Sequence, residues 1–154
     1  MKKRIIFGLG SNLGDREFYL DEAVKQLTAE LDLSNLRRSK ILKNPAMLLL
    51  DSPKEWNREF FNIAFSADIN LEKFSPQKIL EIVKNCEKKL GRIDRERWAP
   101  REIDIDILAI EEMKFHIDHI LTIPHPGLLQ RDFFLKTVAE IEPQILKKLQ
   151  ANLK

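Results

Sequence analysis

Isoleucine and aspartate alternate over residues 103–107, and this short pattern constrains the fold more than any other segment of the chain. Side chains two positions apart on a strand share a face, so Asp104 and Asp106 would project side by side, about 6.5 Å apart at their Cα atoms. The three isoleucines would face the other way. The pattern therefore predicts a strand with an apolar back and two carboxylates on its front, although a plain half-buried strand with a wet face has the same pattern.

The residues next to this strand in the sequence favour a metal or phosphate site over a face that is only exposed to water. Mg²⁺ takes carboxylate oxygens and keeps positions for water and substrate phosphate, so the aspartate pair suits it. Four arginines stand in residues 91–101 just upstream, together with Trp98, which would either stack on a flat ring or anchor the loop. Guanidinium groups suit phosphate oxygens, but exposed arginine runs are often only solvated. Spacing alone leaves both interpretations open.

The length and the charge of the chain limit the classes of protein to which it can belong. At 154 residues the chain is expected to form one domain over residues 1–154. The net charge of +2, from 26 basic and 24 acidic residues, is too balanced to predict a nucleic-acid or membrane partner. Cys86 is the single cysteine, which excludes an internal disulfide, and its place on an apolar helix face predicts a core position. No stretch resembles a secretory signal or a membrane span, so we expect a soluble cytoplasmic protein.

The hydrophobic pattern predicts a mixed order of strands and helices. Asp15 is expected to open the first helix, and Ser75 with Pro76 supplies an N-cap and a first-turn proline to the second. The expected elements are a strand over 5–10, a helix over 15–31, a strand within 35–43, a strand over 60–69, a helix over 75–90, the carboxylate strand, a hairpin over 111–121, a short helical segment near 134 and a last helix after 143.

This order, βαββαβ with additions, predicts an α+β sandwich with a mostly antiparallel sheet and helices packed on one face. The ferredoxin-like arrangement is the leading candidate, with an added hairpin and C-terminal helices. We expect the first and last core strands to lie side by side in the middle of the sheet. Gly10 would then come close to Asp104 and Asp106.

Three further segments carry candidate site residues. Residues 8–15 join a strand to a helix, but their glycine spacing does not match the phosphate-binding motifs, so a plain turn and a ligand contact both stay open. His125 stands between two prolines that would fix its aim at an anion, with Arg131 downstream. Asn62 offers a donor and an acceptor to the edge of a heterocycle. The two histidines of the expected hairpin, by contrast, are expected to face solvent.

Four segments taken together resemble the 6-hydroxymethyl-7,8-dihydropterin pyrophosphokinase (HPPK) family of folate synthesis. They are GLGSNLGD, FFNIAF, GRIDRERWAPREIDIDIL and IPHPGLLQRDFFL, in this order, over residues 5–143. The resemblance implies a ferredoxin-like fold, a single catalytic domain, ATP and two Mg²⁺ ions. It also implies transfer of a pyrophosphoryl group from ATP to the hydroxymethyl oxygen of the pterin, with release of AMP. We expect a monomer that acts on these small molecules.

The resemblance also implies roles for individual residues. Asp104 and Asp106 would hold both magnesium ions, and Arg92 and Arg101 would be the catalytic arginines. The residues implied at the pterin site are Gly10, Asn44, Pro45, Met47, Phe60, Asn62, Trp98 and Phe133. Those implied at the ATP site are Glu87, Arg92, Trp98, Arg101, Ile107, Leu121, Thr122, His125 and Arg131.

Several positions depart from the family pattern. Phe60 stands where tyrosine is common, Asn44 where threonine is common, and Lys84 where glutamine is frequent. The first two changes should leave pterin stacking intact and alter one polar contact. An acid at position 94 stands in a loop that is often basic, so no phosphate role is assigned to Asp94, Arg95 and Arg97.

Two other functions stay open from the sequence. A non-catalytic ferredoxin-like module would bind nucleotide without forming AMP, although such a module has no use for the full set of arginines and aspartates. A two-metal phosphohydrolase would transfer the phosphoryl group to water instead of to a pterin. The products formed from ATP separate these functions from that of a pyrophosphokinase.

Overall fold

The computed structural model of this chain describes residues 2–45, 54, 59–91 and 102–152. Within them the strands are β1 (Lys2–Ser11), β2 (Ser34–Arg38), β3 (Leu42–Asn44), β4 (Phe60–Asn70), β5 (Asp104–Ile110), β6 (Phe115–Ile117) and β7 (Leu121–Ile123). The helices are α1 (Arg16–Glu30), α2 (Pro76–Lys89), α3 (Asp132–Ile141) and α4 (Pro143–Ala151). Of these described helices, none has the length and apolar character needed to cross a bilayer.

The two core helices begin where the capping residues predict. The side chain of Asp15 accepts a hydrogen bond from the backbone N–H of Phe18, so it satisfies one of the free donors in the first turn of α1. Ser75 does the same for Lys78 at the start of α2, where Pro76 takes the first helical position. Both predicted helix starts are confirmed.

The sheet has the predicted α+β arrangement. Its hydrogen-bonded order is β2-β4-β1-β5, with β3 also paired to β4, and the pairs are antiparallel. The single strand expected within residues 35–43 is divided into β2 and β3, which pair with different parts of β4. The hairpin β6–β7 forms a separate two-stranded sheet.

The first and last core strands are neighbours, as predicted, but β5 lies at the end of the hydrogen-bonded order and not in the middle of the sheet. A strand can pair along two edges, and in the described sheet β5 pairs along only one of its two edges, the edge that faces β1. One edge of β1 pairs with β4 along the whole of β1, and β5 takes the other.

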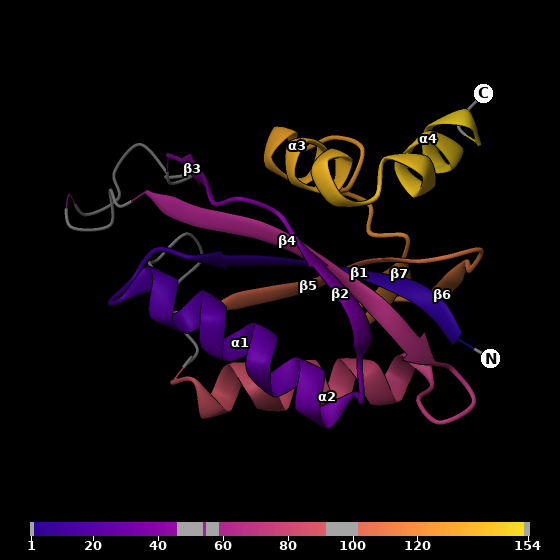
Figure 1. Cartoon of the computed structure of the whole chain (residues 1–154), viewed down its shortest axis with the longest axis horizontal. Helices are drawn as coiled ribbons and strands as arrows, with labels where there is room; N and C mark the ends of the chain where they lie inside the picture. Colours follow the sequence, from indigo (N-terminus) through magenta and orange to yellow (C-terminus); the bar gives the residue numbers. More distant parts are fainter. Residues whose placement is uncertain (1, 46–53, 55–58, 92–101, 153–154) are drawn as a thin grey trace.

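Helices cover both faces of the sheet (Figure 1). The core helices α1 and α2 lie on one face, as expected, and the added helices α3 and α4 lie on the other. The second face carries its own apolar cluster, which includes Ile6 and Leu108 from the strands and Phe134 and Val138 from α3. Because alternate strand residues point to opposite faces, the apolar residues at these positions need a cover of their own.

Gly8 allows α3 to lie close to this second face. A Cβ atom at position 8 would be 2.9 Å from Cε1 of Phe134 and 3.0 Å from Cδ1 of Leu108, which is too close for packed carbon atoms. The absence of a side chain therefore creates the space that the Phe134 ring occupies.

A buried carboxylate ties the junction of α3 and α4 to the sheet. Glu142 is 6% exposed and accepts hydrogen bonds from Arg4 Nη2 at 2.8 Å and from the Ser66 hydroxyl at 2.6 Å. Arg4 also reaches Asp68 at 3.1 Å. A charge this deep is stable only when it is paired and hydrogen-bonded, so these partners hold the helix junction in one position.

Glu142→Ala should lower the free energy of unfolding by about 3 kcal/mol, because it leaves the partly buried Arg4 without its nearest counter-charge and Ser66 without an acceptor. Urea unfolding followed by circular dichroism measures this. Glu112→Ala is the control, because Glu112 pairs with Lys3 in an exposed ion pair and its loss should change stability little. Equal losses in the two variants would contradict a special role for Glu142.

Candidate active site

The strand register brings the aspartate pair beside the glycines of β1. Gly10 lies opposite Asp104, and Gly8 lies opposite Asp106. Along β5 the two aspartates are half-buried while Ile105 and the following isoleucine are buried against α1 and α2. The predicted alternation is therefore confirmed: two carboxylates share one face of a strand whose other face belongs to the main core.

Asp106 is costly to ionise where it stands. Burial, and after it the nearby charge of Asp104, together raise the pKa of Asp106 to about 7. The positive charge of Arg131 acts against this rise. A carboxyl group that resists ionisation until a cation is near is an arrangement suited to binding metal.

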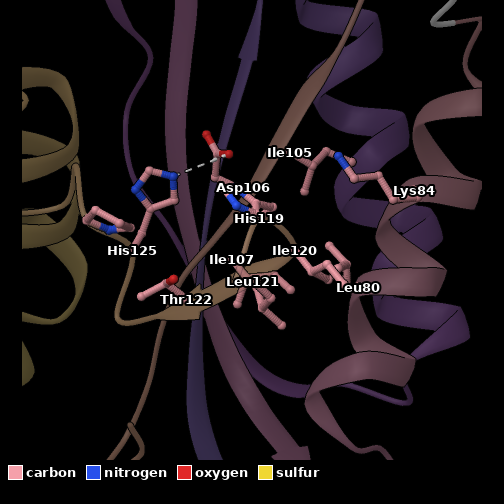
Figure 2. A pocket seen from close by; sticks show the side chains of 11 residues that line it. Leu80, Lys84, Ile105, Asp106, Ile107, His119, Ile120, Leu121, Thr122 and His125 are labelled. Carbon is pink, nitrogen blue, oxygen red and sulfur yellow. Dashed lines mark ion pairs between the residues drawn. The ribbon is translucent and has the colours of Figure 1, made fainter. Parts of the chain in front are cut away.

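His125 points its ring at this pair. Its Nε2 atom lies 3.7 Å from Oδ1 of Asp106 (Figure 2). The backbone N–H of Gly127 donates to Nδ1 at 2.9 Å, so Nδ1 is the acceptor and the ring proton sits on Nε2. Burial lowers the pKa of His125, and the charge of Arg131 lowers it too. The neutral ring therefore offers an Nε2–H donor toward the carboxylate side of the site.

Arg131 stands at the start of α3, on the same side as His125. A Cβ atom built on Gly127 would be 3.0 Å from Nε of Arg131 and 3.2 Å from Nδ1 of His125, so the two side chains flank this glycine. The Arg131 guanidinium also lies over the ring of Phe134, 5.5 Å from its centroid. Arg131 is exposed, and its charge acts on both Asp106 and His125.

A pocket of about 280 Å³ opens beside Asp106. Figure 2 shows side chains from α2, β5 and the β6–β7 hairpin converging on it. Six apolar side chains and five polar ones share the lining, which suits a flat ring with polar edges. The lining residues are Leu80, Lys84, Ile105, Asp106, Ile107, His119, Ile120, Leu121, Thr122, His125 and Pro126.

Four of the residues implied for the ATP site line this pocket: Ile107, Leu121, Thr122 and His125. Glu87 does not line it. This side chain is 3% exposed, and its carboxylate accepts a hydrogen bond from the backbone N–H of Ile105. Arg131 lies outside the lining but acts electrostatically on the pocket residues Asp106 and His125.

Several residues implied for the pterin site gather around Gly10, which lies opposite Asp104. Asn62 is 7% exposed and lies opposite Gly10 on β4, and its amide donates to Oδ1 of Asn44 at 2.5 Å. A Cβ atom at Gly10 would be 2.7 Å from Oδ1 of Asn62 and 3.4 Å from the ring of Phe60. The glycine therefore lets these two side chains lie directly against β1.

Phe133, from the start of α3, is half-buried and packs edge-on against Phe134, with ring centroids 4.6 Å apart. Pro45 follows β3 directly. The remaining predicted site residues lie outside the part of the chain that the structure describes. They are Met47, Arg92, Trp98 and Arg101.

Sequence reasoning missed several pocket residues. His119 and Ile120 lie at the turn of the hairpin and are exposed, as a solvent-facing turn predicts, yet both line the pocket. From the sequence Lys84 is only a departure from the family pattern, and Leu80 lies one turn before it on α2. Helical spacing links residues 80 and 84, but no sequence signal aligns them with the hairpin, because their proximity depends on the tertiary fold.

Cys86 is buried, as its position on the apolar face of α2 predicts. Burial raises the pKa of its thiol to about 12. A thiol that stays protonated is a poor nucleophile and metal ligand, so Cys86 belongs to the core and not to the chemistry of the site.

The fold and the site define a ferredoxin-like domain with a carboxylate pair between two candidate ligand sites. The family described as 7,8-dihydro-6-hydroxymethylpterin-pyrophosphokinase matches residues 6–143. The 2-amino-4-hydroxy-6-hydroxymethyldihydropteridine pyrophosphokinase of Aquifex aeolicus is 36% identical over 146 residues, which cover 92% of this chain and 82% of that protein. The chain belongs to the HPPK family.

Two further comparisons concern longer proteins. The folate synthesis bifunctional protein of Chlamydia muridarum is 37% identical over 149 residues, and this chain spans only 32% of its length. A crystal structure of Plasmodium falciparum HPPK-DHPS with pteroate has a TM-score of 0.63 at 15% identity, over 94% of this chain and 39% of that one. At that identity the likeness concerns the fold alone.

The raised pKa of Asp106 predicts a pH-dependent loss of stability. A folded-state pKa of about 7 stands above the ordinary value of 3.8, so the folded state binds the proton more tightly than the unfolded chain. Without metal, Asp106 should therefore destabilise the fold increasingly from pH 4 to pH 7. Asp106→Asn should melt at nearly the wild-type temperature at pH 4 and at a higher temperature at pH 8.

Thermal unfolding in a metal-free buffer series measures this difference. The gap in melting temperature between Asp106→Asn and the wild type should widen up to about pH 7 and then become constant. A gap that is the same at every pH would show that Asp106 ionises at its ordinary pKa.

Proposed function

We propose that this chain transfers the pyrophosphoryl group of ATP to the hydroxymethyl oxygen of 6-hydroxymethyl-7,8-dihydropterin, releasing AMP, in folate biosynthesis. One observation carries the proposal. Asp104 lies opposite Gly10, whose neighbour on the other side is Asn62 of the asparagine pair, while Asp106 lines the pocket with His125. The carboxylate pair thus stands between one group of residues suited to a heterocycle and another suited to a nucleotide.

Asp104 and Asp106 fit a magnesium site. They present carboxylate oxygens on one face, and burial together with the nearby charge of Asp104 raises the pKa of Asp106. Among the described residues no cluster of three or more His, Cys, Asp or Glu side chains forms a full set of ligands. This suits Mg²⁺, which is commonly held by one or two carboxylates together with water and substrate phosphates. When bound, two such ions would neutralise triphosphate charge.

The pocket suits the base and sugar of ATP. Leu80, Ile107, Ile120 and Leu121 offer an apolar surface to a purine ring, and Thr122 offers a hydroxyl at its edge. The Nε2–H of His125 and the guanidinium of Arg131 lie where the phosphates would leave the pocket toward Asp106. These groups bind and orient the triphosphate chain.

Asn62, with Asn44, would read the polar edge of the pterin, and Gly10 and Pro45 would line its site. Aromatic rings would hold its faces. Phe60 lies against Gly10, and Phe133 stands on the facing helix α3. We assign Met47 and Trp98 to the same site, with Trp98 stacking on the face of the pterin opposite Phe133.

The reaction needs placement and charge neutralisation more than covalent help. The hydroxymethyl oxygen attacks the β-phosphorus and loses its proton, a new oxygen–phosphorus bond forms, and the bond from the β-phosphorus to the α-phosphate oxygen breaks, so AMP leaves. Donors aimed at the developing charge lower the barrier. We assign that role to Arg92 and Arg101, together with the Nε2–H of His125.

We further propose that residues 1–154 form one catalytic domain that acts as a monomer on these small molecules in the cytoplasm. The apolar clusters on both faces of one sheet support a single folding unit. Size-exclusion chromatography with light scattering measures the oligomeric state.

The purified protein should convert ATP and the reduced hydroxymethylpterin into equal amounts of AMP and pterin diphosphate in the presence of Mg²⁺. Chromatography that separates AMP from ADP measures the products. Formation of ADP would contradict the proposal, and nucleotide binding without any product would favour a binding module. Release of pyrophosphate to water with no pterin product would favour a phosphohydrolase.

Asp104→Asn and Asp106→Asn should each lower the turnover rate by about 100-fold or more, because each removes a negative charge that holds cations against the phosphates. Circular dichroism checks that the variants fold. Asp21→Asn is the control, because Asp21 is an exposed carboxylate on α1 that pairs only with Arg38 among the described ion pairs. Full activity in both site variants would remove the metal role from the aspartates.

A further inference from the structure

Glu87 is a charged residue in an apolar position. It lies on the face of α2 that packs into the main core, together with Ile79, Val83 and Cys86, and it is 3% exposed. Burying a carboxylate in such surroundings is unfavourable unless its oxygens are hydrogen-bonded. The partners of Glu87 among the described residues therefore indicate what this charge does.

One partner of Glu87 is the backbone of the carboxylate strand. Oε2 of Glu87 accepts a hydrogen bond from the N–H of Ile105 at 2.8 Å. Ile105 is the residue between Asp104 and Asp106, and β5 is an end strand of its sheet. A strand at the end of a sheet has backbone donors with no neighbouring strand, and Ile105 is itself buried, so Glu87 supplies the acceptor that a further strand would have supplied.

The second oxygen of Glu87 faces the pocket side of α2. Oε1 lies 3.5 Å from Nζ of Lys84, one of the pocket-lining residues. Lys84 is largely exposed while Glu87 is not, so the lysine can meet a ligand and the glutamate cannot without a rearrangement of the helix packing. Glu87 therefore reaches the site through Ile105 and Lys84.

We propose that Glu87 is a positioning residue: its carboxylate holds the Ile105 backbone and thereby fixes the spacing and direction of Asp104 and Asp106. This inference rests on the proposed magnesium role of the aspartate pair. Mg²⁺ and Mn²⁺ demand near-octahedral oxygen geometry, so a shift of the strand backbone that turns either carboxylate would weaken metal binding. Outer partners of metal ligands commonly change metal affinity by 10-fold to 100-fold when they are removed.

Two variants of similar shape test this role. Glu87→Gln keeps a carbonyl oxygen that can accept from Ile105, whereas Glu87→Met keeps the length of the side chain and removes the acceptor. Mn²⁺ affinity, measured by electron paramagnetic resonance in the absence of nucleotide, should fall about 10-fold or more in Glu87→Met and stay within about 3-fold of wild type in Glu87→Gln. Amide exchange measured by NMR should be faster at Ile105 in Glu87→Met only.

Glu81→Met is the matched control. Glu81 is a glutamate of the same helix, it is exposed, and it pairs with Lys78. This variant should bind Mn²⁺ as the wild type does. If Glu87→Met does not fold, Glu87→Asp replaces it, because its carboxylate is one methylene shorter and should lose the same contact and the same Mn²⁺ affinity.

Three results would overturn the positioning role. The first is wild-type Mn²⁺ affinity in Glu87→Met, or in Glu87→Asp where that variant replaces it. The second is an equal loss of Mn²⁺ affinity in Glu87→Gln, which would assign the effect to charge and not to the hydrogen bond. The third is Mn²⁺ binding by the wild type that Asp104→Asn and Asp106→Asn do not weaken. Because none of these measurements uses turnover, a protein that passes them but forms no AMP would contradict the proposed function alone.

Discussion

Gly10 of β1 lies opposite Asp104 of β5, and Gly8 lies opposite Asp106, so the two residues without side chains stand beside the two carboxylates. The space above Gly8 holds the ring of Phe134, which anchors α3 to the sheet. The space beside Gly10 holds Asn62 and Phe60. The antiparallel register of one strand pair thus decides where the third helix packs and where the candidate pterin residues gather. A shift of one residue would turn the carboxylates into the opposite core.

Negative charges lie close together at the candidate site, whereas the buried carboxylate at the other end of the sheet is paired with a positive charge. Asp106 has a raised pKa because it is buried near Asp104, and Glu87 adds a further negative charge. At the other end of the sheet, Glu142 is satisfied by Arg4 and Ser66. The contrast is physically informative. A paired carboxylate stabilises a helix junction, whereas two like charges left side by side indicate a place where a cation belongs.

Local patterns predicted the parts of the fold that depend on local physics. The two-residue period of β5 predicted which face Asp104 and Asp106 share, and Asp15 and Ser75 marked the helix starts through their capping side chains. The second layer of helices was harder to predict, because Ile6, Gly8 and Leu108 come together only when β1, β5 and α3 meet. For the same reason no sequence pattern joined Lys84 with Ile120, or Glu87 with the backbone of Ile105. The roles of Arg92, Trp98 and Arg101 stay predictions, since these residues lie outside the described part of the chain.

The tautomer of His125 is decided by the backbone and not by the ring itself. The N–H of Gly127 donates to Nδ1, and the same loop segment lets Arg131 approach, because a side chain at position 127 would meet both groups. With Nδ1 occupied, the proton on Nε2 faces Asp106. Burial and the Arg131 charge lower the pKa of the ring from its ordinary value of 6.5, which favours the neutral form. A neutral donor can orient an oxygen without adding to the charge of the site.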